Sequence, residues 1–126
     1  MNSTFTRILR VILGLGLIFF GLNKFIHFNF VPTPTFTEEA TNFMNSLDNT
    51  GYVLLVLGAF EIIIGLLLLF KKWVSFALIL LAPITLNILL FHMFLDSPGI
   101  LLAMIVVGLN GMLIYKHWKN YRPLFN

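Results

Sequence analysis

Residues 51–70 read GYVLLVLGAFEIIIGLLLLF, and this stretch decides the fold. A helix of about 20 residues rises about 30 Å, which is the thickness of the hydrocarbon core of a bilayer. Backbone N–H and C=O groups in hydrocarbon must bond within the segment, so the run predicts a helix rather than a strand. A single carboxyl group, that of Glu61, interrupts the apolar run. We therefore expect a transmembrane helix with one acidic side chain inside it.

Three further apolar runs predict three more transmembrane helices. Of the 126 residues, 59% are hydrophobic and 10% are charged, whereas a soluble domain has about 25% charged residues. This composition excludes a soluble enzyme, a disordered tail and a coiled coil. The absence of cysteine excludes disulfides and cysteine metal sites. We expect one all-α domain over residues 1–126, a membrane four-helix bundle with spans over 8–28, 51–70, 73–95 and 99–118.

Lys and Arg residues predict the orientation of these helices. Seven of the eight lie at the start of the first span, between the second and third, or at the end of the fourth. Cytoplasmic loops carry an excess of Lys and Arg, so we expect a multi-pass protein of the bacterial inner membrane with both termini in the cytoplasm. The first run is too long for the apolar part of a signal peptide and lacks an A-x-A-like cleavage site, so we expect it to be retained. The basic residues follow membrane topology, so the expected partner is the lipid bilayer and not nucleic acid.

The outer segment 29–50 is long for a bare loop. Thr37 is a good helix N-cap, and two glutamates follow it in the first turn. The next apolar residues are spaced as on one face of a helix, so we expect a short amphipathic helix on the outer surface. Two roles stay open for this helix, namely closing the end of the bundle and covering a cavity as a lid. Its apolar face would consist of Ala40, Phe43, Met44 and Leu47.

Glu61 is the residue that lipid tolerates least. An ionisable side chain inside a span costs several kcal/mol unless it is paired or hydrated, so it is a candidate functional residue. Spacings of three and four place Glu61 on one helix face with Gly58 and Gly65, which allow close approach of a neighbouring helix. Lys24 lies on a matching glycine stripe of the first span, and a contact with Glu61 is geometrically reasonable because the first two helices are antiparallel neighbours. The pair could be functional, could fix the helix register, or could be broken, with Lys24 reaching the surface and Glu61 protonated.

Three asparagines extend this polar cluster. Asn23 is next to Lys24 in the sequence. Asn87 and Asn110 both fall about 12–17 Å from the outer boundary, by the rise of a helix, which is close to the depth of Glu61. Together these residues would form a ligand site near the membrane midplane, whereas singly each would serve as an interhelical hydrogen bond. The candidate ligand-binding or structural cluster is Glu61, Lys24, Asn23, Asn87 and Asn110.

The three histidines do not predict a metal site. His27, His92 and His117 form no H-x-x-H or H-x-x-x-H pair, and His117 lies at the opposite membrane face from the other two. A haem held by His27 and His92 is the remaining alternative. His92 is five residues after Asn87, which is a rotation of about 140° on a helix. If Asn87 faces the bundle, we expect His92 to face lipid or a neighbouring helix.

Two motifs resemble the DoxX family of small bacterial membrane proteins. Residues 10–14 (RVILG) and 21–25 (GLNKF) resemble the first helix of that family, and residues 58–67 (GAFEIIIGLL) resemble its second helix. The resemblance implies a four-helix membrane bundle and an association with membrane redox systems. Some relatives are linked to a thiosulfate:quinone oxidoreductase, as its DoxD-type subunit, or to a complex that handles thiol and superoxide stress. Because this chain has no cysteine, thiol chemistry would need the sulfur of a partner.

Three functions follow as hypotheses. The first is a small subunit of a membrane redox system that binds a hydrophobic ligand such as a quinone, with Lys24 and Glu61 as its polar contacts or proton route. The second is a non-catalytic accessory subunit that packs on a membrane oxidoreductase or on a second copy of itself. The third is a transporter of protons or a small solute, in which Glu61 acts as the relay.

Overall fold

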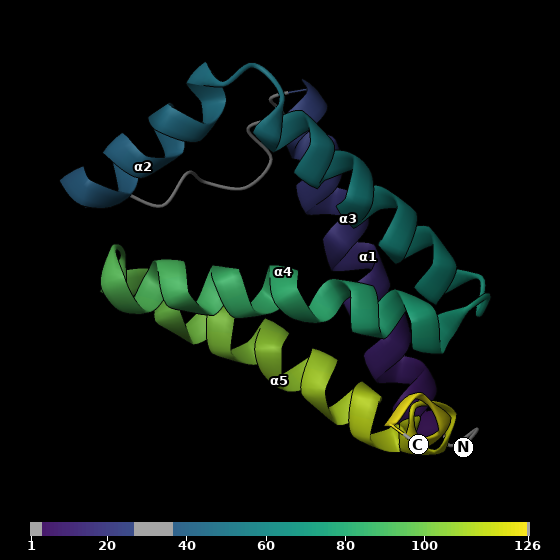
Figure 1. The fold of residues 1–126 in the computed structure, drawn as a ribbon. Helices are drawn as coiled ribbons and strands as arrows, with labels where there is room; N and C mark the ends of the chain where they lie inside the picture. The colour runs from purple at the N-terminus through teal and green to yellow at the C-terminus, as the bar shows by residue number, and fades with distance from the viewer. Residues whose placement is uncertain (1–3, 27–36, 126) are drawn as a thin grey trace.

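The computed structural model describes residues 4–26 and 37–125, and every regular element in them is helical. The long helices appear in Figure 1, coloured in chain order. Short 3-10 helices follow α4 and α5. The elements are α1 (Thr4–Ile26), α2 (Glu38–Asn49), α3 (Val53–Leu69), α4 (Val74–Phe94), η1 (Ser97–Gly99), α5 (Ile100–Lys116), η2 (Trp118–Asn120) and η3 (Arg122–Phe125).

Helix length and composition make this a multi-pass membrane protein, as the sequence predicted. Within the described residues, three helices are long and apolar enough to cross a bilayer: Thr4–Phe25, Val74–Phe94 and Ser97–Lys116. The remaining predicted span, over 51–70, corresponds to α3, which has 17 residues and is joined to α2 at a bend of 90°. The chain therefore has three candidate spans, or four when the bent pair counts as one.

Backbone conformation explains where α3 begins and ends. Gly51 has a φ of 81°, which places it in the left-handed region and breaks the helix before Val53. At the other end Lys71 and Trp73 have φ values of 55° and 50°, so the chain leaves the helix directly after Leu69. The helix is consequently shorter at both ends than the apolar run over 51–70.

Glycines bring α1 and α3 into backbone contact. The two helices run antiparallel side by side (Figure 1) and form the most extensive helix pair of the structure. A Cβ atom on Gly65 would lie 2.7 Å from the carbonyl oxygen of Gly14, and one on Gly21 would lie 2.7 Å from that of Gly58. Small residues that allow such approach are typical of helix interfaces in membranes. The two glycine stripes in the sequence therefore correspond to one interface.

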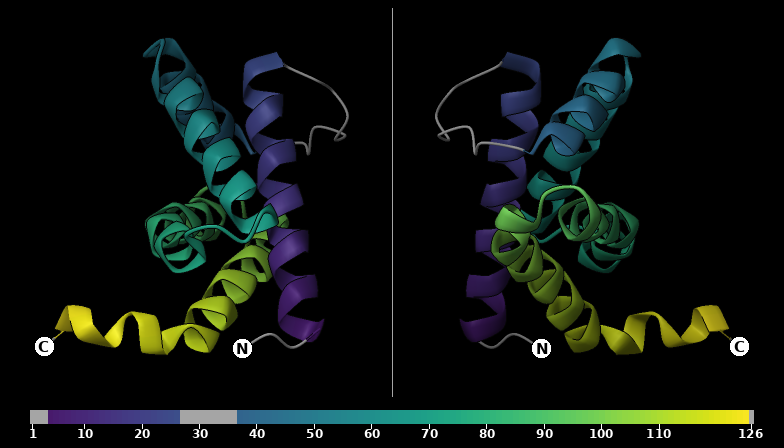
Figure 2. Two further views of the ribbon diagram at one scale, coloured as in Figure 1. Left: turned by 90° about the vertical axis from the view of Figure 1, so that its right-hand side faces the viewer. Right: turned by 90° about the vertical axis from the view of Figure 1, so that its left-hand side faces the viewer.

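Helices α4 and α5 form a second pair that crosses the first. In Figure 2, α1 stands upright while α4 is seen end-on, so α4 crosses α1 steeply. The hydrophobic core lies where the two pairs meet, and its fully buried side chains come from α3, α4 and α5 with two leucines of α1 at its edge. The core consists of Leu13, Leu17, Ile64, Leu68, Ala77, Leu78, Leu81 and Leu113.

Arg10 has a structural role that its position in a basic flank did not predict. Its side chain is buried, and its Nη1 atom donates to the carbonyl oxygen of Leu68 and, at 3.3 Å, to that of Leu69. The last carbonyls of a helix have no partner within the helix, and the negative end of the helix dipole favours a cation. Arg10 of α1 therefore caps the C-terminus of α3.

The expected amphipathic helix of the outer segment is present as α2. Thr37 is its N-cap, since the hydroxyl oxygen accepts a hydrogen bond from the backbone N–H of Ala40 at 3.2 Å. The same hydroxyl group donates to the carbonyl oxygen of Leu95, directly after α4. Ala40 is fully buried. The start of α2 is thus fastened to the end of α4.

Candidate functional site

Lys24 and Glu61 form an ion pair between α1 and α3. The Nζ atom of Lys24 lies 2.6 Å from Oε1 of Glu61, and the side chains are 21% and 3% exposed. Apart from this ion pair, Oε1 has no hydrogen-bond partner among the described residues. Gly58, one helical turn before Glu61, makes room for the lysine, because a Cβ atom there would lie 3.1 Å from Cβ of Lys24. The structure therefore brings together the two charges that the sequence placed on facing stripes.

The ion pair lies in the wall between two apolar cavities. The larger, here called the α2 cavity, has a volume of about 660 Å³ and lies among α2, α3 and α4. The smaller, here called the α5 cavity, has a volume of about 310 Å³ and lies between α1 and α5. Lys24, Glu61 and Ile88 line both. A ligand in either cavity would meet hydrocarbon walls and one charged pair.

The apolar face of α2 forms one wall of the α2 cavity. Phe43, Met44 and Leu47 line it, and the ring of Phe43 packs against that of Phe91 of α4 with 5.7 Å between centroids. Ala40 is buried, Met44 and Leu47 are half-buried, and Phe43 remains exposed at the rim of the cavity. This placement is compatible with both roles that the sequence left open for the helix, closing the end of the bundle and covering a cavity.

Asn87 shares the α2 cavity with the ion pair. Its side chain lines that cavity, and its Nδ2 atom donates to the carbonyl oxygen of Pro83 at 2.8 Å. This bond lies within α4. Asn87 is therefore a neighbour of the Lys24–Glu61 pair around the same space.

Asn110 and Asn23, the other two asparagines of the predicted cluster, lie outside both cavities. Asn110 is buried, donates to the carbonyl oxygen of Leu78 at 3.1 Å and accepts from the hydroxyl group of Thr85 at 2.9 Å, so it links α5 to α4. Asn23 is half-buried, and its Oδ1 atom has no hydrogen-bond partner among the described residues. Neither asparagine lines the α2 cavity or the α5 cavity.

His92 and Asp96 form a polar pair that the sequence analysis missed. Nδ1 of His92 lies 3.2 Å from Oδ2 of Asp96, which is buried. His92 lines the α2 cavity together with Asn87, so two side chains about 140° apart on the helix border the same space. Gly99 leaves space for the pair, since a Cβ atom there would lie 2.7 Å from the imidazole ring. The helical period did not indicate this pair, because Asp96 follows the end of α4.

Metal ligands do not gather in the described part of the chain, where no group of three His, Asp or Glu side chains lies together. His27, considered above as a haem ligand with His92, lies outside the described residues. His117 is at the far end of α5 and bonds to the carbonyl oxygen of Leu113 at 2.8 Å. The site is therefore described by its ion pair and its cavities.

The fold and this intramembrane ion pair define a small helical multi-pass membrane protein. The sequence model of the DoxX family, described as DoxX, matches residues 5–93, so the chain belongs to the DoxX family. The match extends beyond the motifs of the first two spans through α2 and most of α4, including Asn87 and His92. No curated protein and no solved structure matches the chain.

Proposed function

We propose that this DoxX-family protein binds a hydrophobic ligand of the quinone class at the Lys24–Glu61 pair, as a small subunit of a membrane redox system. The observation that carries the proposal is the position of this pair in the wall shared by two apolar cavities. Small-molecule sites have volumes of about 300–1,000 Å³ and combine apolar walls with a few polar groups. The α2 cavity fits that description.

The chemistry of a quinone suits these side chains. The Lys24 ammonium group would donate a hydrogen bond to a ring carbonyl, and a bond to a charged group is the stronger kind. Oε1 of Glu61, which has no other partner among the described residues, would accept from the hydroxyl group of the reduced ring. Hydrocarbon side chains would surround the ring and the prenyl tail. His92, held by Asp96, offers a second polar contact on the same cavity.

The membrane and partner assignments belong to the same proposal. The basic residues favour the bacterial inner membrane with both termini in the cytoplasm. In that orientation α2 covers the α2 cavity from the outer side as a lid. Because this chain has no cysteine, a membrane oxidoreductase would exchange electrons with the bound quinone. A second copy of this chain is the other candidate partner, and it would share the ligand without supplying electrons.

Quinone titration of the purified protein tests the proposal. A short-chain ubiquinone is added to the protein in detergent, and binding is followed by calorimetry. We expect Glu61→Gln and Lys24→Met to weaken binding roughly tenfold or more, since each removes a charge-assisted hydrogen bond. Asn23→Leu is the matched control, because Asn23 neighbours Lys24 but lines neither cavity. Equal affinity in all of these variants would exclude the pair as the ligand contact.

A structural role for the ion pair is the second candidate. The observation in its favour is the backbone contact of α1 and α3 at Gly21 and Gly58, close to the pair. In this case Lys24 and Glu61 would fix the register of the two helices, and the protein would act as an accessory subunit. The double variant Lys24→Met with Glu61→Leu would then leave every binding property unchanged.

A further inference from the structure

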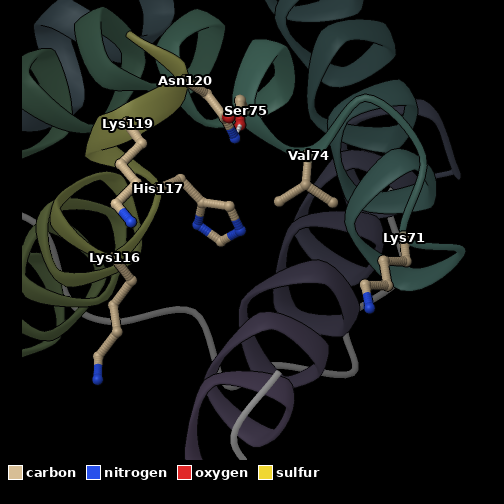
Figure 3. Close-up of a pocket in the computed structure, with 7 residues that line it drawn as sticks. All are labelled: Lys71, Val74, Ser75, Lys116, His117, Lys119 and Asn120. Carbon is tan, nitrogen blue, oxygen red and sulfur yellow. Dashed lines mark hydrogen bonds between the residues drawn. The ribbon is translucent and has the colours of Figure 1, made fainter. Parts of the chain in front are cut away.

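We propose a second site, at the other end of α4, that binds the phosphate group of an anionic lipid headgroup. A pocket of about 440 Å³ lies there between the start of α4 and the end of α5. Figure 3 shows the side chains of Lys116 and Lys119 on one side of His117 and that of Lys71 on the other. This pocket is separate from both cavities described above, and the inference does not depend on the quinone proposal.

The charged side chains that line this pocket are lysines. Lys71, Lys116 and Lys119 line it, and no Asp or Glu is among the lining residues. The five acidic residues of the sequence are at positions 38, 39, 48, 61 and 96, so none lies in the segments that build the pocket. A group of lysines in this position attracts an anion from outside the chain.

Neutral donors and a helix terminus complete the pocket. Asn120 donates to Oγ of Ser75 at 2.6 Å, so the hydroxyl proton of Ser75 remains available to a ligand. Ser75 is in the first turn of α4, whose N-cap residue Trp73 supplies no side-chain hydrogen bond to that turn. Free N–H groups at a helix N-terminus bind phosphate well. The lysines, the hydroxyl group of Ser75 and the N-terminus of α4 therefore all favour a phosphate ligand.

Two contacts hold the pocket in shape. The phenol group of Tyr121 donates to the carbonyl oxygen of Ser75 at 2.7 Å, which fastens the segment after α5 to α4. Burial raises the pKa of Tyr121, so the phenol keeps the proton that it donates. The ammonium group of Lys116 lies 5.7 Å from the centre of the Phe5 ring, which positions the side chain by a cation–π contact.

Exposed aromatic side chains identify the source of the phosphate as lipid. Trp73, Tyr115 and Trp118 are all exposed at this end of the structure. Trp and Tyr are enriched at the level of the lipid headgroups, and basic pockets between helices on the cytoplasmic side bind anionic headgroups. The pocket thus lies where lipid phosphate is concentrated, at the end that the sequence predicts to be cytoplasmic.

Native mass spectrometry of the delipidated protein tests this site. Phosphatidylglycerol or phosphatidylcholine of the same chain length is added, and bound lipid is counted. The pocket variant is Lys116→Gln with Lys119→Gln, and the control is Lys72→Gln with Arg122→Gln, which removes equal charge from exposed residues that do not line the pocket. We expect the pocket variant to bind phosphatidylglycerol at least about tenfold more weakly and the control to change less than about twofold.

Four results would overturn the proposal. Equal losses in the pocket variant and the control would mean diffuse attraction by the whole basic face. Unchanged binding in both, or equal retention of the two lipids by the unaltered protein, would mean that no anionic headgroup site exists. Displacement of the lipid by millimolar inorganic phosphate would assign the pocket to the free ion. Thermal unfolding of both variants verifies that they are folded.

Discussion

Gly21 of α1 faces Gly58 of α3 so closely that a Cβ atom on Gly21 would lie 2.7 Å from the carbonyl oxygen of Gly58. The obstacle is backbone, which has no rotamer to change. Lys24 follows Gly21 by one helical turn, and Glu61 follows Gly58 by one turn. The close approach of the two backbones is therefore what allows the ion pair to form.

A methyl group at Gly21 should separate the two helices. We expect Gly21→Ala to lower the free energy of unfolding by about 1–3 kcal/mol, as overpacking does. Gly16→Ala, on the same helix, is the control, because a Cβ atom at Gly16 meets nothing within 4 Å. This control should be neutral or slightly stabilising. Thermal unfolding in detergent measures both, and equal stability of the two variants would contradict the backbone contact.

Removing one charge of the ion pair should lower the free energy of unfolding more than removing both charges. We expect Lys24→Met or Glu61→Leu alone to lower the free energy of unfolding by about 3–5 kcal/mol, because an uncompensated buried charge remains. The free energy of unfolding of the double variant should lie within about 1 kcal/mol of that of the unaltered protein, since a buried ion pair and an apolar pair are of similar stability. Additive losses in the double variant would show that the two side chains do not interact.

The interhelical bonds of Asn110 give a separate test of the α4–α5 contact. We expect Asn110→Leu to lower the free energy of unfolding by about 1 kcal/mol, from two hydrogen bonds of about 0.6 kcal/mol each. Asn87→Leu should have a smaller effect, because the bond of Asn87 lies within its own helix. Chemical unfolding in mixed micelles compares the two. A greater loss of unfolding free energy in the Asn87 variant would mean that Asn87, and not Asn110, makes the more stabilising contact between helices.

The docking of α2 should depend on the hydroxyl group of Thr37. We expect Thr37→Val to lower the stability of α2 by about 1 kcal/mol through loss of the N-cap, and to release the helix from Leu95 as well. Amide exchange over residues 38–49 should then accelerate, while exchange in α3 stays the same. Ser46→Ala is the control, since Ser46 is exposed and bonds only within α2. Unchanged exchange in the Thr37 variant would contradict the proposed fastening.

The sequence was sufficient for features that depend on spacing within one helix. The four apolar runs follow from composition and length. The glycine stripes, and the positions of Lys24 and Glu61 on them, follow from the period of the helix. The apolar face of α2 could be predicted for the same reason.

Features that depend on how helices rotate against each other could not be predicted. The role of Arg10 required knowing that the carbonyls of Leu68 and Leu69 lie beside it. Asn110 bonds to Thr85, a residue that no local pattern had marked. Asp96 follows the end of α4, so the loop geometry, and not the helical period, brings it to His92.

Photolabelling with a light-activated quinone analogue tests the central proposal most directly. After illumination in the membrane, the labelled residues are mapped by mass spectrometry. The account predicts labels on α2, α3 and α4 at residues such as Phe43, Met44 and Leu57, which line the α2 cavity, and their loss with excess ubiquinone. Labels spread over the exposed faces of α4 and α5, unaffected by excess ubiquinone, would contradict it.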